Sequence, residues 1–541
     1  MGRLTALDDE VFDALVIGGG IAGAGVARDL ATRGALVALF EKGDFASGTT
    51  SRSSKLIHGG LRYLELLDFA LVRESLRERE TLRRLAPHLV RPLPFLIPIY
   101  RGSKRGLIKV RLGLALYDLL APGPGSSRPR VLNASEALSL EPELRPEDLR
   151  GAGYYFDDLL LFPERLCLEN VLSAAHQGAR VFNYCRVEEV VRGRRGIDGV
   201  KVRDLVSGQV HVARGRVVVN AAGPWVDQIR ELAGVADRGR RVVRTTKGIH
   251  CLLPRITERA LYLSSRDDRM IFVIPWRDFS LLGTTDTDFE GDPDQLWASR
   301  DEVAYLLGEV RRILQDPRVT EEQVCYTYAG VRPLTFEAGR SASRVSRQHR
   351  ILLEGPGGRF LTITGTKLTC FRSLAEEVGD RVMRLLGRRE RSRTAQLALS
   401  GTDGEAERIE ARACMDVSAE LAATGLDRET LEVLVETYGR ACPRVLDLAR
   451  KLPDGAGRLC PSNREIIAQL HHAVSDELVV SLQDFLLRRT GIGTSPCQGL
   501  DCAEAIGRRM AEALEWSPSL LDAELRAYHD TIERSRRFQH S

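Results

Sequence analysis

The chain has 541 residues, of which 43% are hydrophobic and 28% are charged. This composition predicts a globular protein of several domains and excludes a collagen, a disordered tail and a disulfide-rich miniprotein. The 78 basic and 74 acidic residues leave a formal net charge of +4, which is no signal for nucleic-acid binding. The sequence contains no run of 18 apolar residues and no secretory signal, so we expect a cytoplasmic protein with reduced cysteines and no transmembrane helix.

The first 40 residues predict the start of a nucleotide-binding α/β fold. Residues 11–17, VFDALVI, are mostly apolar, which is typical of a buried parallel strand. Residues 22–33 are rich in Ala and favour a helix, and residues 35–40 favour a second strand. Apolar runs at 217–219 and 359–363 predict further strands of the same sheet.

The rest of the chain predicts two other kinds of structure. Residues 245–330 contain short strand-like segments, including 270–275 and 280–284, which favour an inserted antiparallel sheet. After about residue 400 strand signals vanish, and helical periodicity appears at 428–438 and 477–487. We therefore expect a helical C-terminal domain that begins near residues 399–404.

The strongest motif is the glycine-rich turn GGGIAG at 18–23, between the first strand and the first helix. Gly18 permits a tight turn, Gly20 lets the backbone approach a pyrophosphate, and Gly23 lets helix and strand pack closely. Glu41 follows the second strand, where a carboxylate can accept hydrogen bonds from a ribose. Residues 45–60, FASGTTSRSSKLIHGG, are rich in hydroxyl groups and Gly, and such a loop favours a flavin over a nicotinamide.

Seven motifs in one order over residues 1–375 resemble FAD-dependent glycerol-3-phosphate dehydrogenases, flavoproteins with a D-amino-acid-oxidase-like fold. They are the turn at 18–23, SKLIHGGLRYLE at 54–65, NAAGPW at 220–225, TKGIH at 246–250, GTTD at 283–286, AGVRPL at 329–334 and GTKLT at 365–369. HGGLRYLE is highly specific, and a weaker match extends to DFLLRRT at 484–490.

The resemblance implies a Rossmann-like FAD-binding domain at residues 1–95, 150–245 and 330–399. It further implies a substrate-binding domain, built on the inserted antiparallel sheet, at 96–149 and 246–329, and an all-helical cap at 400–541. The implied activity is oxidation of sn-glycerol 3-phosphate to dihydroxyacetone phosphate by hydride transfer to FAD. An oxygen-using oxidase and a non-catalytic flavin-binding scaffold are the alternatives.

The implied electron acceptor is a membrane quinone, reached by a homo-oligomer from the cytoplasmic face of the inner membrane. The sequence leaves quinone, oxygen and a partner protein open as acceptors. Residues 103–114 mix basic and apolar side chains, as an interfacial segment does, but a solvent-facing helix with a core stripe has the same pattern.

The resemblance and the residue chemistry together nominate the catalytic groups. Alcohol oxidation needs a general base near the hydroxyl, and His250 is the first candidate because histidine titrates near neutral pH. His58 is the other matched histidine, but its Gly-rich loop favours contact with the flavin. Arg332 is expected to stabilise the developing alkoxide and to bind substrate.

The substrate phosphate calls for arginine, and Arg62 with Tyr63 is matched to that role. Lys367 is expected near the pyrimidine edge of the flavin and near the substrate. The residues expected to bind the cofactor are Gly18, Gly20, Gly23, Glu41, Thr50, Ser51, Ser54, Lys55, Leu56, His58, Val187, Ala221, Gly223, Trp225, Gly365, Lys367, Leu368 and Thr369.

Two stretches depart from the family pattern. FPERL at 162–166 lacks the acidic pair that precedes Arg and Leu in relatives, so Arg165 receives no role. Cys497 and Cys502 resemble half of the [2Fe–2S] site of anaerobic-type relatives, but upstream only Cys460 offers a thiol, since Ser462 stands where a second one is needed. Because such clusters take four thiolates, a vestigial site or plain thiols are favoured over a bound cluster, and no metal is expected.

Overall fold

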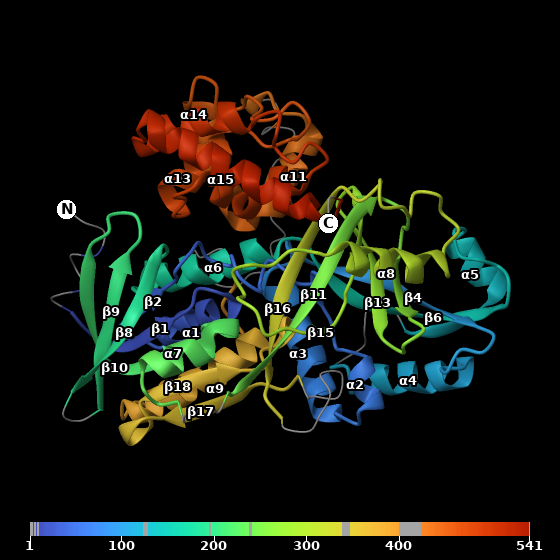
Figure 1. Ribbon diagram of the computed structural model, residues 1–541, viewed down its shortest axis with the longest axis horizontal. Coiled ribbons are helices and arrows are strands. Elements are labelled where there is room, and N and C mark those ends of the chain that lie inside the picture. The colour runs from blue at the N-terminus through green and yellow to red at the C-terminus, as the bar shows by residue number, and fades with distance from the viewer. Residues whose placement is uncertain are drawn as a thin grey trace.

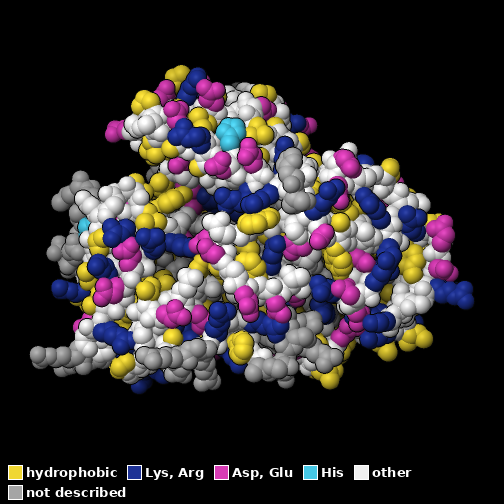
Figure 2. Space-filling view, in the orientation of Figure 1, with side chains coloured by type: hydrophobic (Ala, Val, Ile, Leu, Met, Phe, Trp, Pro, Cys, Tyr) yellow, Lys and Arg dark blue, Asp and Glu magenta, His cyan; other side chains and the backbone are white. Residues whose placement is uncertain are grey.

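The computed structural model describes residues 4, 7, 10–122, 128–193, 196–236, 241–337, 347–399, 421 and 423–539. Two β-sheets stand side by side, and a helical lobe formed by the C-terminal residues lies across them above α6 (Pro163–His176) (Figure 1). None of the described helices has both the length and the hydropathy that a membrane-spanning segment requires. On the face shown in Figure 2, basic and acidic side chains are interspersed.

The first sheet contains eight strands within the described residues. Its parallel core is formed by β18, β10, β1, β2 and β7, and β17, β8 and β9 join it as antiparallel strands. The bounds are β1 (Val11–Ile17), β2 (Val37–Phe40), β7 (Arg180–Phe182), β8 (Cys185–Gly193), β9 (Gly196–Asp204), β10 (Val210–Asn220), β17 (Arg350–Glu354) and β18 (Phe360–Thr364). The predicted strands at 11–17, 217–219 and 359–363 are thus confirmed as members of one sheet.

The second sheet contains ten strands in the described part of the chain, and nearly all of its pairs are antiparallel. The bounds are β3 (Leu56–Ile57), β4 (Val90–Tyr100), β5 (Arg130–Asn133), β6 (Leu149–Leu160), β11 (Val243–Pro254), β12 (Ala260–Ser264), β13 (Met270–Trp276), β14 (Phe279–Gly283), β15 (Thr287–Asp288) and β16 (Tyr326–Thr335). β3, β6 and most of β16 come from ranges expected in the FAD-binding domain, so this sheet extends beyond the predicted substrate-binding ranges.

Helices cover the sheets and form the C-terminal lobe. Besides α6, the bounds are α1 (Ile21–Thr32), α2 (Arg62–Glu65), α3 (Phe69–Leu85), α4 (Leu107–Leu120), α5 (Ala134–Leu140), α7 (Val226–Leu232), α8 (Arg300–Arg311), α9 (Phe371–Leu385), α11 (Arg428–Tyr438), α12 (Cys442–Lys451), α13 (Ile467–Asp476), α14 (Ala503–Leu514) and α15 (Pro518–Arg536). The predicted helix at 428–438 is confirmed. Of the boundary expected at 399–404, residues 400–404 lie outside the described residues.

The helix predicted at 477–487 is wrong in its first half. Leu478 has a φ of 57°, in the left-handed region that a continuous helix excludes. The Asp484 carboxylate accepts hydrogen bonds from the backbone N–H groups of Val480 and Ser481, both at 2.9 Å. These bonds cap a new turn, so the helical residues begin only after Ser481.

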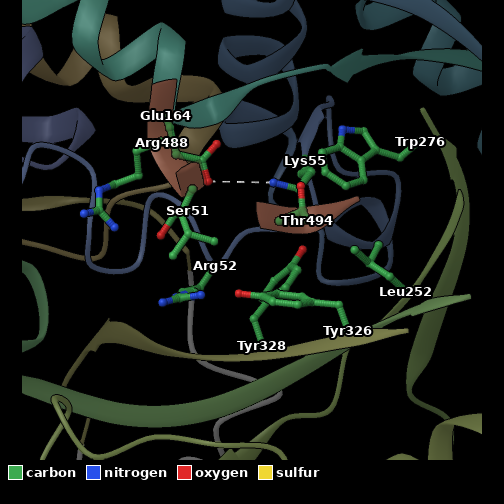
Figure 3. Close-up of a pocket in the computed structure, with 11 residues that line it drawn as sticks. Ser51, Arg52, Lys55, Glu164, Leu252, Trp276, Tyr326, Tyr328, Arg488 and Thr494 are labelled. Carbon is green, nitrogen blue, oxygen red and sulfur yellow. Dashed lines mark ion pairs between the residues drawn. The ribbon is translucent and has the colours of Figure 1, made fainter. Parts of the chain in front are cut away.

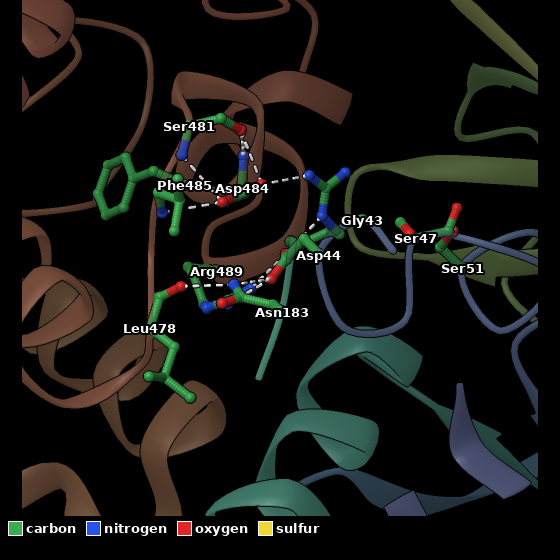
Figure 4. A network of polar contacts seen from close by, with 12 residues as sticks. Gly43, Asp44, Ser47, Ser51, Asn183, Leu478, Ser481, Asp484, Phe485 and Arg489 are labelled. Carbon is green, nitrogen blue, oxygen red and sulfur yellow. Dashed lines mark hydrogen bonds and ion pairs between the residues drawn. The ribbon is translucent and has the colours of Figure 1, made fainter. Parts of the chain in front are cut away.

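A buried polar network fastens the C-terminal lobe to the loop after β2 (Figure 4). The Asp44 carboxylate accepts hydrogen bonds from Arg488 at 2.6 Å and from both Nη atoms of Arg489 at 2.8 and 2.9 Å. Arg165, which received no role from the sequence, is buried and pairs with Glu477 of the lobe. An apolar cluster that includes residues of β13, β14 and α15 completes the junction.

Candidate active site

The glycine-rich turn leaves the N-terminus of α1 open to a ligand. Gly18 has a φ of 106°, and a Cβ on Gly23 would lie 1.9 Å from the Gly18 carbonyl oxygen, so close packing excludes other residues there. Gly20 is the N-cap residue of α1 and offers no side-chain hydrogen bond to the helix. The positive end of the α1 dipole at this turn therefore suits a phosphate.

The loop after β2 folds back onto this turn. The two Glu41 carboxylate oxygens accept hydrogen bonds from the N–H groups of Gly19 at 2.6 Å and Gly43 at 2.8 Å. Burial raises the pKa of Glu41, and these two N–H donors oppose the rise. Thr50 accepts a hydrogen bond from the N–H of Ile21 at 3.1 Å, so it lies at the start of α1.

The end of β10 forms the other wall of the nucleotide site. A Cβ on Gly18 would lie 2.6 Å from the Ala221 carbonyl oxygen, which places the two turns in contact. The Trp225 ring lies under Lys42, whose Nζ is 3.9 Å from the ring centroid. Trp225 Nε1 is buried and has no hydrogen-bond partner among the described residues. A buried orphan donor beside an open helix N-terminus fits a dinucleotide cofactor.

His250 lies in the second sheet, where β11 passes between β14 and β16. Its Nε2 is 2.8 Å from Ser54 Oγ, and its ring stacks on Tyr328 with centroids 4.8 Å apart. Its Nδ1 is buried without a partner among the described residues. Burial lowers the pKa of His250 well below its usual range, and the charges of Arg332 and Lys55 lower it further. The imidazole is therefore neutral near pH 7.

Arg332 is held in a fixed orientation on β16. Its guanidinium donates to Asp286 at 3.1 Å, to the hydroxyl of Thr284 at 2.6 Å and to the carbonyl oxygen of Thr285 at 3.2 Å. Burial lowers the pKa of Arg332, and Asp286 opposes this. The charge that lowers the pKa of His250 comes in part from Arg332, so the two expected catalytic residues lie together.

Tyr63 stands in a group of cationic side chains. Burial raises the pKa of its phenol, while the charges of Arg347, Arg62 and Arg332 oppose the rise. Lys367 Nζ lies 5.2 Å from the centroid of the Tyr63 ring. No hydrogen bond or ion pair joins the Arg62 side chain to another described residue, so its donors are open to a ligand.

Lys367 links two segments of the expected cofactor site. Its Nζ donates to the carbonyl oxygen of His58 at 2.7 Å and to Ser75 Oγ at 2.9 Å, and Thr369 Oγ1 donates to the same carbonyl at 3.2 Å. Burial lowers the pKa of Lys367 to about 8, although Cys370 opposes the shift. The neighbouring Gly365 turns with a φ of 73°.

Sequence reasoning missed Arg347 and did not assign Asp286. Arg347 approaches Asp286 at 3.4 Å and acts electrostatically on Tyr63. Arg347 lies outside any helix, strand or recognised sequence motif, so its local sequence does not indicate a role. Asp286 is the last residue of the GTTD motif, so the sequence could have identified it. The expected cofactor residue Val187 lies on β8 and is buried in an apolar core with Ile17 and Phe40 of the first sheet.

A small cavity lies against the loop that follows β2 (Figure 3). It has a volume of about 30 Å³, and its lining includes Ser51, Lys55, Glu164 and Tyr328. Lys55 Nζ lies 3.9 Å from the Glu164 carboxylate and 4.6 Å from the Trp276 ring centroid. This space admits about one water molecule, so it is a small polar pocket between Lys55 and Tyr328 rather than a site for a flavin ring.

Comparison with known proteins identifies the family. Residues 13–366 match the FAD dependent oxidoreductase family and residues 392–520 match the C-terminal domain of alpha-glycerophosphate oxidase. A glycerol-3-phosphate dehydrogenase from Synechocystis sp. is 35% identical over 99% of both chains. An aerobic glycerol-3-phosphate dehydrogenase from Staphylococcus aureus is 34% identical over 98% of this chain and 95% of its own.

A solved structure agrees over nearly the whole chain. The glycerol-3-phosphate dehydrogenase from Bacillus halodurans, complexed with FAD, superposes with a TM-score of 0.81 at 29% identity, covering 99% of this chain and 96% of that one. The resemblance predicted from the motifs is thereby confirmed, as are the α/β fold with its helical C-terminal region and the FAD cofactor. The chain belongs to the family of FAD-dependent glycerol-3-phosphate dehydrogenases.

Proposed function

We propose that the protein oxidises sn-glycerol 3-phosphate to dihydroxyacetone phosphate. The observation that carries the proposal is the group of cationic side chains around Tyr63, next to the buried His250. A phosphate monoester carries nearly two negative charges at neutral pH, and arginine forks are the side chains that best match it. When bound, FAD supplies the two-electron acceptor for the oxidation.

His250 is proposed to take the hydroxyl proton. If its Nε2–H donates to Ser54, the Nδ1 lone pair has no partner among the described residues; because Nδ1 is buried, the substrate hydroxyl reaches it only after neighbouring side chains move. Because the pKa of His250 is lowered, the ring is in the accepting form throughout the neutral range. Ser54 then acts as the residue that sets the tautomer and the ring orientation.

Arg332 is proposed to hold the oxygen on which negative charge develops. Its bonds to Asp286 and Thr284 fix the guanidinium before substrate arrives, so little reorganisation is needed during the reaction. Arg62, with Tyr63 beside it, and Lys367 are proposed to bind the phosphate end. This division places Arg332 at the reacting carbon and the cations of Arg62 and Lys367 at the phosphate end of a short substrate.

We further propose that α4 rests on a membrane and that the reduced enzyme passes its electrons to a quinone there. Ile108, Leu112 and Leu119 are 79%, 67% and 80% exposed and lie on one stripe of α4, since they recur at helical spacing. A solvent-facing helix with a core stripe has a polar outer face, whereas this outer stripe is apolar. Lys104 and Lys109 lie beside it and suit anionic lipid headgroups.

The membrane proposal is tested by flotation with vesicles of mixed anionic and neutral phospholipids. We expect the wild-type protein to float and the double variant Ile108→Glu, Leu112→Glu to stay in the dense fraction with its FAD bound. Equal flotation of both would refute the assignment of α4. If this stripe is instead buried in a homo-oligomer, light scattering should give a smaller molecular mass for the double variant than for the wild type.

The catalytic proposal is tested by an anaerobic visible spectrum before and after addition of sn-glycerol 3-phosphate. We expect the oxidised flavin band to bleach and a quinone analogue to restore it. A band that persists at full FAD occupancy would refute the substrate. Rapid restoration by oxygen, with release of peroxide and no response to the quinone analogue, would favour the oxidase alternative.

A further inference from the structure

Three thiols and one carboxylate converge in the C-terminal lobe, in a place that the proposed reaction does not use. Cys460 Sγ lies 3.7 Å from Cys497 Sγ and 3.7 Å from Asp501 Oδ1. The ligand atoms of Cys460, Asp501 and Cys502 all lie within 4.8 Å of one another. Cys460 and Cys502 are buried, while Asp501 is exposed, so the group opens to solvent on one side.

The spacing of these atoms suits a single tetrahedral ion. A Zn–S bond of about 2.3 Å requires neighbouring sulfur ligands about 3.8 Å apart, and the Cys460–Cys497 separation is 3.7 Å. Thiolate ligands select zinc among the common divalent ions. The ligand atoms of Cys460, Asp501 and Cys502 lie within 4.8 Å of one another, and Cys497 Sγ joins them through its contact with Cys460 Sγ.

The surroundings of the sulfur atoms are arranged as they are around metal-bound thiolates. Asn463 Nδ2 donates to Cys460 Sγ at 2.9 Å and to Cys497 Sγ at 3.2 Å, and the N–H of Gly499 donates to Cys497 Sγ at 3.4 Å. Ser462 Oγ donates to Asp501 Oδ2 at 3.3 Å, which directs the other carboxylate oxygen toward Cys460. Outer donors of this kind orient ligands and stabilise their charge.

We propose that the C-terminal lobe binds one zinc ion through Cys460, Cys497, Cys502 and Asp501. On binding, the three S–H groups lose their protons to solvent and three Zn–S bonds and one Zn–O bond form. The ion joins the turn before α13 to the turn before α14, two segments that also meet through the hydrogen bonds of Ser462 and Asn463 and through apolar side chains. Its role is structural, because all four coordination positions are filled by protein.

The test measures metal content of the full-length holoenzyme by mass spectrometry, relative to FAD. We expect about one zinc per chain, and less than about a tenth of that in Cys460→Ser and Cys502→Ser. Cys325→Ser is the matched control, since Cys325 is a partly buried cysteine outside the group, and it should retain the zinc. Equal zinc in Cys460→Ser and wild type would overturn the proposal. Two iron and two sulfide per chain with no zinc would also overturn it.

A second measurement uses the wild-type protein and does not depend on how the variants fold. Titration with an organomercurial thiol reagent should release zinc in step with modification of three cysteines. Replacement of zinc by cobalt should give the intense red-region absorption of a tetrahedral cobalt thiolate, beyond the flavin bands. Modification of these cysteines without release of zinc, or a weak octahedral cobalt spectrum, would show that the thiols are not ligands.

Discussion

Asp44 binds the C-terminal lobe to the loop after β2, which is expected to contact the cofactor. Replacing Asp44 by Asn tests the contribution of this contact to stability. Its side chain is fully buried and accepts hydrogen bonds from Arg488 and Arg489. Removing one partner of a buried ion pair lowers the free energy of unfolding by about 3–5 kcal/mol. Arg488 keeps Asp484 at 2.6 Å, and Arg489 keeps the Glu477 carbonyl oxygen at 2.8 Å, so we expect the lower end, about 3 kcal/mol.

The pH dependence of this loss has a defined sign. Burial alone would raise the pKa of Asp44, but Arg489 and Arg488 outweigh it, so the pKa is lowered in the folded protein. A lowered pKa stabilises the fold above the unfolded value of about 4 and loses that effect as the pH falls through the folded value. The difference between wild type and Asp44→Asn should therefore be full at pH 7 and shrink below about pH 4.

The assay is urea unfolding of the holoenzyme, followed by circular dichroism and by flavin fluorescence. Asp44→Asn should unfold at lower urea and release FAD earlier, because Asp44 lies in the loop between Glu41 and Thr50. Asp476→Asn is the control, since its carboxylate is about half exposed and accepts its hydrogen bond from the exposed Ser475, with His472 Nδ1 farther away at 3.3 Å; it should cost less than about 0.5 kcal/mol. Equal stability of the two variants would refute the reasoning.

Three further predictions concern the active site. Arg332→Ala should lower kcat about 100- to 1,000-fold with FAD still bound, measured by steady-state kinetics with a quinone analogue; a change only in KM would contradict this role. Because the pKa of His250 is lowered, kcat/KM of the wild type should show no inflection near pH 6.5 and should fall only at lower pH; His250→Asn should lose most activity across the range, and retention would exclude it as the base. The pKa of Lys367 is about 8, so kcat/KM should fall above about pH 8; Lys367→Arg should shift this limb to higher pH, and an unchanged limb would assign it to another group.

Local patterns were sufficient to predict the glycine-rich turn and the strands and helix that flank it. The spacing of Gly18 and Gly23 reflects steric limits within a single turn, and the structure shows both limits directly. The strand at 11–17 and the helix at 428–438 begin and end where their periodicity predicted. These features depend on interactions between residues that are close in sequence, so a short stretch of sequence is enough to predict them.

Tertiary structure alone decided which distant groups meet. Nothing near Arg347 indicates that it faces Tyr63, and nothing near Cys460 places its sulfur 3.7 Å from that of Cys497. β6 belongs to the second sheet because it pairs with β4 in a long antiparallel ladder. In the chain, α4, β5 and α5 separate these two strands. Such pairings gain their free energy from burial and from partners far away in sequence, so no local propensity records them.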